Sequence, residues 1–166
     1  SELIAFNNRI EDFEKRNTQV LGCSVDSHFS HLRWKEMDIN SGGIGNVKYP
    51  LISDLDKSIS RSYDVLLGST PATVLFEDDE VETTVGGGVT MRGSFLIDED
   101  GVIRHAVLND LPLGRNIDEM IRMIDALSHH QKHGEVCPAG WKDGDTAMAE
   151  SPEGVSSYLT ENSDNL

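Results

Sequence analysis

The segment from His133 to Trp141 constrains the fold more than any other stretch, because a helix cannot pass through it. The segment reads His-Gly-Glu-Val-Cys-Pro-Ala-Gly-Trp and follows a strongly helical pattern. Gly134 favours a helix end, and Pro138 has no backbone N–H to donate within a helix. Cys137 is therefore predicted on irregular chain just beyond a helix. A thiol placed there can reach solvent or a partner chain, which suits a cysteine that forms and breaks disulfides.

Composition and charge exclude several classes of protein. The chain has 166 residues, enough for one domain with a single core. Lys and Arg number 14 against 29 Asp and Glu, so the net charge is −15 and phosphate-based nucleic-acid binding is disfavoured. An apolar run of about 18 residues, as a membrane span needs, is absent from the sequence. The two cysteines also exclude a disulfide-rich framework and a four-cysteine zinc site.

Three histidines, His129, His130 and His133, cluster near the expected end of a helix. Their spacing is that of part of a metal site, but the nearby sequence does not complete a ligand set. The favoured interpretation is that imidazoles lie at a helix C-terminus, where their partial positive charge is stabilising.

Apolar periodicity predicts an alternation of helices and strands. Helices are expected over residues 2–16, 27–40, 58–65 and 116–133, and strands over 18–25, 49–52, 92–97 and 102–108. A tight turn at residues 98–101 should join the last two strands as an antiparallel hairpin. This order predicts an α/β domain of the thioredoxin-like kind, a mixed sheet with helices on both faces. We expect its first strands to precede Ser1.

The segment 68–90 has a different character from the rest. Two β-rich runs, 73–76 and 81–85, flank an acidic turn at 77–80, and three glycines follow at 86–88. The segment is either a hairpin or a mobile loop. We expect one domain over residues 1–142, with 68–90 as an insert or hairpin. Residues 143–166, rich in Gly, Ser, Glu and Asp, are predicted to form a mobile C-terminal tail.

Several motifs in register resemble those of the typical two-cysteine peroxiredoxins, of the alkyl hydroperoxide reductase or thioredoxin peroxidase type. They occur in family order across nearly the whole chain. The segment 68–90 is longer here than the family usually has. The matching pieces are Val-Asp-Ser at 25–27 with His31 and Trp34, Gly-Gly-Ile-Gly at 42–45, Arg-Gly-x-Phe-Leu-Ile-Asp at 92–98, Asn-Asp-Leu-Pro-x-Gly-Arg at 109–115, and the stretch around Cys137.

The resemblance implies a thiol-dependent peroxidase that reduces hydrogen peroxide and organic hydroperoxides. In the family, a peroxidatic cysteine attacks the O–O bond and becomes a sulfenic acid, and a resolving cysteine of the partner subunit then forms a disulfide with it. Cys137 stands at the position of the resolving cysteine. Ser1 and Glu2 match the end of the motif that follows the peroxidatic cysteine, which is therefore expected about two positions upstream of Ser1.

The resemblance also assigns three further site residues. Arg92 matches the active-site arginine that lowers the thiol pKa and hydrogen-bonds peroxide. Glu2 matches a carboxylate that positions arginines, and Arg115 matches a second arginine near the substrate pocket. Without the resemblance, these residues would be interpreted as a strand residue on the surface, an acidic residue in a first helical turn, and a loop charge.

The remaining cysteine and the two tryptophans are predicted to be structural. Cys23 lies in the apolar run 20–25 and is expected in the core, where a free cysteine behaves as a small hydrophobe. Trp34 and Trp141 are expected to pack rather than to bind substrate.

The resemblance implies no metal, haem or flavin cofactor, since sulfur carries the redox chemistry. Electrons would come from thioredoxin or a flavoprotein disulfide reductase, and homodimers paired near residues 102–108 would assemble to a decamer. We expect a reducing cytoplasmic location. The alternative function is a non-catalytic ring that acts as a chaperone or redox relay. Another thioredoxin-fold enzyme is disfavoured because the sequence has no Cys-x-x-Cys.

Overall fold

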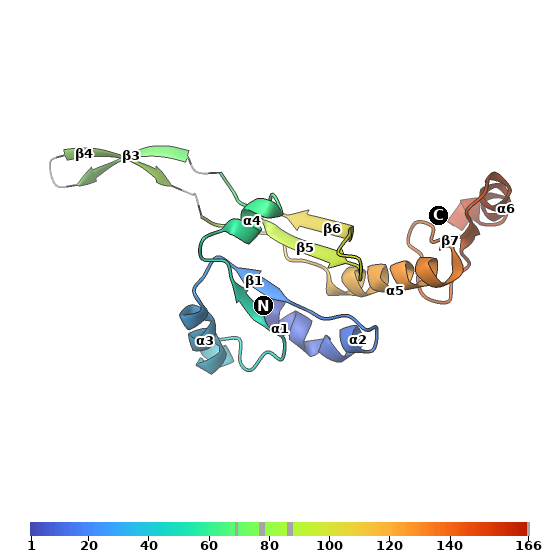
Figure 1. Cartoon of the computed structure of the whole chain (residues 1–166), viewed down its shortest axis with the longest axis horizontal. Coiled ribbons are helices and arrows are strands. Elements are labelled where there is room, and N and C mark those ends of the chain that lie inside the picture. Colours follow the sequence, from blue (N-terminus) through green and yellow to red (C-terminus); the bar gives the residue numbers. More distant parts are fainter. Residues whose placement is uncertain (69, 77–78, 86–87, 166) are drawn as a thin grey trace. The chain divides into compact units, whose positions relative to one another are not determined.

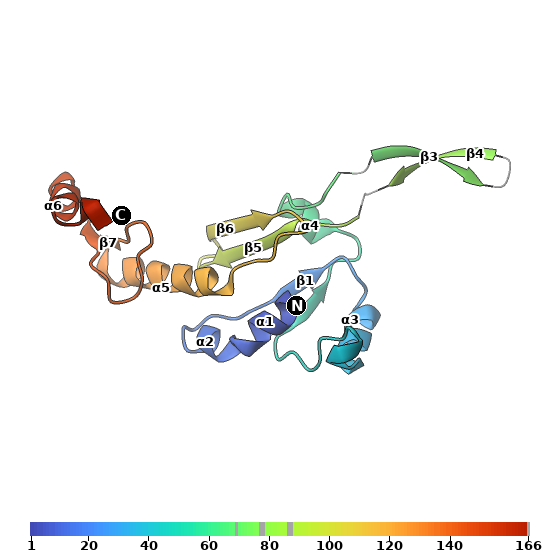
Figure 2. The ribbon, with the colours of Figure 1, turned by 180° about the vertical axis from the view of Figure 1, so that it is seen from behind.

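The computed structural model describes residues 1–68, 70–76, 79–85 and 88–165 (Figures 1 and 2). The chain divides into two compact units. One unit comprises Ser1–Ser94 and Ala106–Arg115, and the other comprises Phe95–His105 and Asn116–Leu166. Among the described helices, none combines the length and the apolar character that crossing a membrane requires.

The first unit begins with two short helices in the region where one helix was predicted. These are α1 (Glu2–Asn8) and α2 (Ile10–Glu14). Arg9 separates them with a non-helical φ of −111°. The apolar spacing still places Ile10 and Phe13 inside, at 5% and 3% exposure.

A parallel strand pair follows. Strand β1 (Gly22–Ser24) pairs with β2 (Leu51–Ser53) in parallel, with Cys23 opposite Ile52. The crossover between them contains α3 (His28–Glu36), which is capped by the Ser27 hydroxyl through a hydrogen bond from the Ser30 N–H at 3.2 Å, and η1 (Ile39–Ser41). The predicted strands and helix are therefore present, although each is shorter than its apolar pattern.

The Gly-Gly-Ile-Gly stretch at 42–45 forms a tight loop after η1. Gly42 has a φ of 89°, in the left-handed region that favours glycine. A Cβ on Gly43 would lie 2.0 Å from the Met37 carbonyl oxygen. The loop can approach the end of α3 this closely only because position 43 has no side chain, and it delivers Ile44 to the core at 8% exposure.

The core of the first unit lies between α1, α2 and the β1–β2 pair. The Tyr49 hydroxyl donates to the Leu3 carbonyl at 2.7 Å, and burial raises the pKa of Tyr49 to about 12. Trp34 packs at the margin of this core, which confirms its predicted structural role. The buried members are Ile10, Ile44, Val47 and Tyr49, and Leu3, Ile4, Phe6, Val20, Trp34 and Leu51 pack against them.

Helix α4 (Ser58–Ser62) ends earlier than the predicted 58–65. It begins over the buried carboxylate of Asp54, which is 1% exposed. The backbone N–H groups of Ile59 and Ser60 donate to this carboxylate at 3.0 and 2.8 Å. These bonds satisfy donors that the start of a helix would otherwise leave unpaired.

The segment 68–90 contains strands β3 (Thr70–Phe76) and β4 (Asp79–Val85). They pair antiparallel, with Thr70 opposite Val85 and Phe76 opposite Asp79 (Figure 1). Of the two predicted alternatives, the structure has the hairpin. Residues 77–78 of the acidic turn and glycines 86–87 lie outside the described residues.

Strands β5 (Arg92–Ile97) and β6 (Ile103–Asn109) pair with each other, as predicted. The turn between them is closed by Gly101, whose N–H donates to the Asp98 carbonyl at 3.0 Å and whose φ is 78°. The Asp98 side chain accepts from the Val102 N–H at 2.9 Å and pairs with Arg104 at 2.5 Å. Over the described residues, strands pair two by two as four two-stranded sheets, and not as one continuous mixed sheet.

Helix α5 (Ile117–His133) has both predicted ends. The Asn116 side chain caps it by accepting from the Asp118 and Glu119 N–H groups, and Gly134 ends it with a φ of 70°. Strand β7 (Glu135–Val136) then pairs antiparallel with β8 (Met148–Ala149). The segment 143–166, predicted as a mobile tail, thus carries regular elements: β8, α6 (Pro152–Asn162) and η2 (Ser163–Asn165).

Candidate active-site residues

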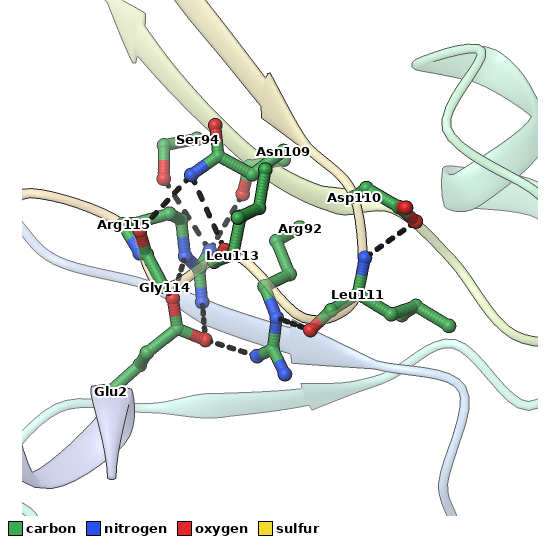
Figure 3. A network of polar contacts seen from close by, with 10 residues as sticks. Glu2, Arg92, Ser94, Asn109, Asp110, Leu111, Leu113, Gly114 and Arg115 are labelled. Atoms are coloured by element: carbon green, nitrogen blue, oxygen red, sulfur yellow. Dashed lines mark hydrogen bonds and ion pairs between the residues drawn. The ribbon is translucent and has the colours of Figure 1, made fainter.

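One carboxylate, that of Glu2, joins two arginines in the first unit (Figure 3). Arg115 Nε donates to Glu2 Oε1 at 2.9 Å, and Arg115 Nη2 donates to Oε2 at 3.2 Å. Arg92 Nη1 also donates to Oε2. The three residues that the sequence assigned to the site, far apart along the chain, therefore form one polar cluster, which we call the Glu2 cluster.

Arg92 reaches this cluster from the first position of β5. Its Nε donates to the Leu111 carbonyl at 2.6 Å, while Nη1 is held by Glu2. The side chain is 38% exposed, so the guanidinium is fixed by two groups and still accessible to a small solute. This differs from a surface strand residue with a mobile side chain, which was the alternative interpretation.

Arg115 is more deeply placed, at 21% side-chain exposure. Its backbone N–H donates to Glu2 Oε1 at 2.8 Å, and Nη1 donates to the Gly93 carbonyl at 2.7 Å. Its guanidinium carbon also lies 5.8 Å from the centre of the Phe6 ring, within the range of a cation–π contact. Arg115 is thus a framework residue that ties α1 to β5.

The Asn-Asp-Leu-Pro-x-Gly-Arg motif folds as a loop that presents these groups (Figure 3). Asn109 Nδ2 donates to the Gly114 carbonyl at 3.1 Å, and the Leu113 N–H donates to the Asp110 carbonyl at 3.0 Å. The closed loop aims the Leu111 carbonyl at Arg92 and brings Arg115 to Glu2. The motif residues therefore act mainly by holding backbone groups in place.

The electrostatics of the Glu2 cluster favour an anion. Burial acts to raise the pKa of Glu2, but hydrogen bonds and attraction from Arg115, with a hydrogen bond from Arg92, outweigh it and lower this pKa to about 2. Glu2 is therefore ionised at neutral pH. Two guanidiniums against one carboxylate leave a positive excess, which suits stabilisation of a nearby thiolate or a peroxide oxygen.

Cys137, described within the second unit, lies just after β7. Its thiol donates to the Ala126 carbonyl of α5 at 3.5 Å, a long and weak bond, and the residue is half-buried. Burial raises the pKa of the thiol; the charge of Arg122 opposes this rise and that of Glu135 adds to it. Cys137 is a free thiol.

Sequence reasoning missed the neighbours of Cys137 on α5. Arg122 Nη1 donates to the Trp141 carbonyl at 2.9 Å, and its other nitrogens pair with Glu119. The spacing of Glu119 and Arg122, one helical turn apart, signals an ion pair but not the contact with the loop. Trp141 itself is 2% exposed, which confirms the prediction that it packs.

The three histidines engage with β7 and with one another. His129 Nε2 lies 2.8 Å from Glu135 Oε2, and His130 Nδ1 lies 2.8 Å from the Glu135 carbonyl. The ring centres of His129 and His133 are 4.7 Å apart. Within the described parts of the chain, no group of three or more His, Cys, Asp and Glu side chains is arranged to hold a metal ion.

Cys23 is exposed, so the prediction that it fills the core was wrong. Its neighbours Gly22 and Ser24 are half-buried, and the side chain of Cys23 falls on the opposite face because side chains alternate along a strand. Partial desolvation, with a smaller contribution from the Asp54 carboxylate, raises the pKa of its thiol. An exposed thiol with a raised pKa is a poor nucleophile.

Known families match most of the chain. Residues 1–106 match the AhpC/TSA family, and residues 126–161 match the C-terminal domain of 1-Cys peroxiredoxin. The first match includes Glu2 and Arg92, and the second includes Cys137.

Individual proteins are similar over nearly the full chain. Alkyl hydroperoxide reductase C of Helicobacter pylori is 48% identical over 163 residues, 98% of this chain and 73% of that protein. A mitochondrial thioredoxin-dependent peroxide reductase of Drosophila melanogaster is 46% identical over 153 residues, 92% of this chain and 58% of that protein. The crystal structure of reduced Plasmodium vivax 2-Cys peroxiredoxin superposes with a TM-score of 0.82 at 43% identity, covering 96% of this chain and 73% of that one.

Proposed function

Because the chain belongs to the AhpC/TSA family, it is a thiol-dependent peroxidase of thioredoxin-like fold, and we propose that Cys137 resolves its sulfenic acid. The observation that carries this proposal is the setting of Cys137. Its thiol is half-buried and is held by one weak bond to a backbone carbonyl. Such a thiol is a poor nucleophile towards peroxide, and it is easily released from its weak bond to Ala126.

The proposed step replaces an S–O bond by an S–S bond and releases water. The Cys137 thiolate attacks the sulfur of a sulfenic acid on the partner subunit, an S–S bond forms, and the S–O bond breaks. The hydroxide that leaves takes up the proton lost by Cys137, and water is released. The oxidant that first forms the sulfenic acid is the substrate, which is hydrogen peroxide or an organic hydroperoxide.

The sulfur that attacks peroxide is, in this proposal, neither Cys23 nor Cys137. Direct attack on an O–O bond requires a thiolate at neutral pH. Both thiols have raised pKa values. Among the contacts that the structure describes, neither thiol receives the hydrogen bond from a guanidinium that such a nucleophile needs. The sulfenic acid is therefore proposed to form on a sulfur other than these two.

The Glu2 cluster is the proposed site for that chemistry. Arg92 would stabilise the thiolate and donate to the peroxide, because its fork is fixed by Glu2 and Leu111 and remains partly exposed. Glu2 would orient both arginines, and Arg115 would hold Glu2 in place while adding positive charge. The roles of all three residues are proposals that rest on this geometry.

The reductant is proposed to be thioredoxin or a flavoprotein disulfide reductase. The Drosophila relative is a thioredoxin-dependent peroxide reductase, which supports the thioredoxin alternative. We also propose that the protein works in a reducing compartment such as the cytoplasm, because a cycling pair of thiols needs a supply of reductant.

We also propose that the chain forms homodimers that assemble to a decamer. In the described residues, β6 pairs with β5 alone, so its other edge is available to a second copy. Val102, Ile103 and Leu108 near that edge are 44%, 48% and 46% exposed. Sedimentation of the protein under reducing conditions tests both assembly states.

Peroxide consumption tests the role of Cys137 directly. Protein expressed from its complete gene is mixed with hydrogen peroxide, thioredoxin, thioredoxin reductase and NADPH. Cys137→Ser is expected to lose reductase-coupled turnover while retaining one rapid oxidation per subunit. Non-reducing gels of the peroxide-treated wild type should show a two-chain species that the variant lacks.

Cys23→Ser is the matched control, because it removes the other thiol of the chain. It should retain turnover and the two-chain species. Full turnover in Cys137→Ser, or a two-chain species that depends on Cys23, would refute the proposal.

A further inference from the structure

We propose that Arg122 is a positioning residue for Cys137, because its guanidinium ties the Cys137 loop to α5 and carries a positive charge that acts on the thiol. The Cys137 loop is defined here as residues 137–145. This inference rests on the proposed function, since it concerns the thiol that resolves the sulfenic acid. Arg122 touches neither substrate nor reacting sulfur and acts only through Cys137.

The guanidinium of Arg122 is held in one orientation by Glu119. Nε donates to Oε2 at 2.6 Å and Nη2 donates to Oε1 at 2.7 Å, the paired geometry in which arginine binds a carboxylate most strongly. Both residues lie on α5, and the Arg122 side chain is 23% exposed. The hydrogen bond from Arg122 lowers the pKa of Glu119, so the pair is charged on both sides at neutral pH.

The third guanidinium nitrogen reaches the Cys137 loop. Nη1 donates to the Trp141 carbonyl at 2.9 Å. The indole of Trp141 is buried, and its Nε1 donates to the Asp145 carbonyl at 3.0 Å. The loop is thus fixed at Trp141 from two directions, by burial of the ring and by the guanidinium bond to the backbone.

Cys137 at the start of this loop has no comparable attachment among the contacts described. Its thiol makes the weak bond to Ala126 at 3.5 Å, and the chain before it is the short strand β7. Cys137 can therefore move while Trp141 stays in place. Movement of the thiol would not require the loop to leave α5.

The charges that face the thiol come from two elements. Arg122 on α5 favours the thiolate, whereas Glu135 on β7 disfavours it. Glu135 is itself engaged by His129 of α5 at 2.8 Å. Arg122 is therefore the group in this neighbourhood whose charge favours the ionised, reactive form of Cys137.

Alkylation of Cys137 by iodoacetamide as a function of pH tests the charge effect without any peroxide chemistry. Three proteins are compared in a Cys23→Ser background: Arg122, Arg122→Gln and Arg122→Lys. The midpoint of the rate profile should rise by about 0.5 pH unit in Arg122→Gln, less than a close and fully buried charge would give. Arg122→Lys should keep the original midpoint, because it keeps the charge.

Formation of the peroxide-induced two-chain disulfide tests the positioning effect, in proteins that retain every cysteine except Cys23. The rate of disulfide formation should fall about threefold in Arg122→Lys. The ammonium group of lysine cannot reproduce the planar guanidinium, which hydrogen-bonds Glu119 and the Trp141 carbonyl at the same time. Arg122→Gln should be slower still. Arg33→Gln, which removes another arginine paired with a glutamate one turn away, is the matched control and should match wild type in both assays.

An unchanged alkylation midpoint in folded Arg122→Gln would overturn the charge effect, and an unchanged disulfide rate in Arg122→Lys would overturn the positioning effect. If Arg122→Gln does not fold, the lysine variant decides the proposal by its disulfide rate. Failure of the proposed function looks different. There, Cys137→Ser keeps its reductase-coupled turnover, while the alkylation profile of Cys137 still responds to Arg122.

Discussion

Arg115 Nε lies 2.9 Å from Glu2 Oε1, although the two residues are 113 positions apart in the sequence. This contact joins the start of α1 to the loop that follows β6, and Arg92 shares the same carboxylate. The orientation of both arginines, one on β5 and one in this loop, therefore depends on a side chain from the first turn of α1.

Substitution of Glu2 should change how stability depends on pH. The pKa of Glu2 is lowered from 4.5 to about 2, so below pH 4.5 the unfolded chain takes up a proton at this site while the folded chain does not. Wild type should thus lose stability from this site as the pH falls from 4.5 towards 2. Glu2→Gln should lack this loss, and at pH 7 it should be about 1–3 kcal/mol less stable, because two arginines lose a charged acceptor.

Urea unfolding from pH 2 to pH 7 measures both effects. Glu14→Gln is the control, since Glu14 is an exposed acid of the neighbouring helix. If the free energy of unfolding of Glu2→Gln and of wild type changed with pH in the same way, the lowered pKa of Glu2 in the Glu2 cluster would be contradicted.

Arg92→Lys should slow the reaction with peroxide about tenfold or more, because a lysine keeps the charge but cannot hold Glu2, Leu111 and a peroxide oxygen at once. Stopped-flow measurement of peroxide reduction gives the second-order rate constant. Arg104→Lys is the matched control, since Arg104 pairs with Asp98 in the other unit. Equal rate constants for Arg92→Lys and the control would remove Arg92 from the proposed site.

Gly43→Ala should destabilise the protein by about 1–3 kcal/mol, the usual cost of forcing atoms into packed space. The added Cβ would meet the Met37 carbonyl oxygen at 2.0 Å. Thermal unfolding followed by circular dichroism measures the effect. Gly68→Ala provides the comparison, because a Cβ there meets nothing within 4 Å, and its midpoint should stay close to that of wild type.

Trp141→Phe retains an aromatic ring but removes the indole N–H that donates to Asp145. We expect a loss of about 1–3 kcal/mol, because the Asp145 carbonyl loses its partner beside a side chain that is 2% exposed. Urea denaturation measures it, and Trp34→Phe, at the margin of the other unit's core, should cost less. If Trp34→Phe lost more stability than Trp141→Phe, the hydrogen bond from the Trp141 indole would not be a main attachment of the Cys137 loop, which other contacts would then hold.

Elements with local signals could be predicted from the sequence. Asn116 and Gly134 mark the two ends of α5 through side-chain capping and a positive φ, and both act within a few residues. The turn at 98–101 is equally local, since Asp98 bonds the backbone of its own turn. The break at Arg9 has no such signal, and the periodic pattern continues through it.

Contacts between distant segments were less accessible to sequence reasoning. The family resemblance predicted that Glu2, Arg92 and Arg115 lie near one site. Periodicity alone would only predict three charged residues on the surface. The exposure of Cys23 was missed because an apolar run shows that a strand is apolar but not which face packs. The bond from Arg122 to Trp141 was missed because its acceptor is a backbone carbonyl, which any residue provides.

The weak bond from Cys137 to the Ala126 carbonyl links the chemistry of a sulfur atom to a helix. A sulfur in a disulfide carries no hydrogen, so oxidation removes this donor and leaves the carbonyl to its helical partner alone. Backbone amides in the last turns of α5 should then exchange with deuterium at different rates in the reduced and oxidised protein. The helix would in this way report the oxidation state of a residue that lies outside it.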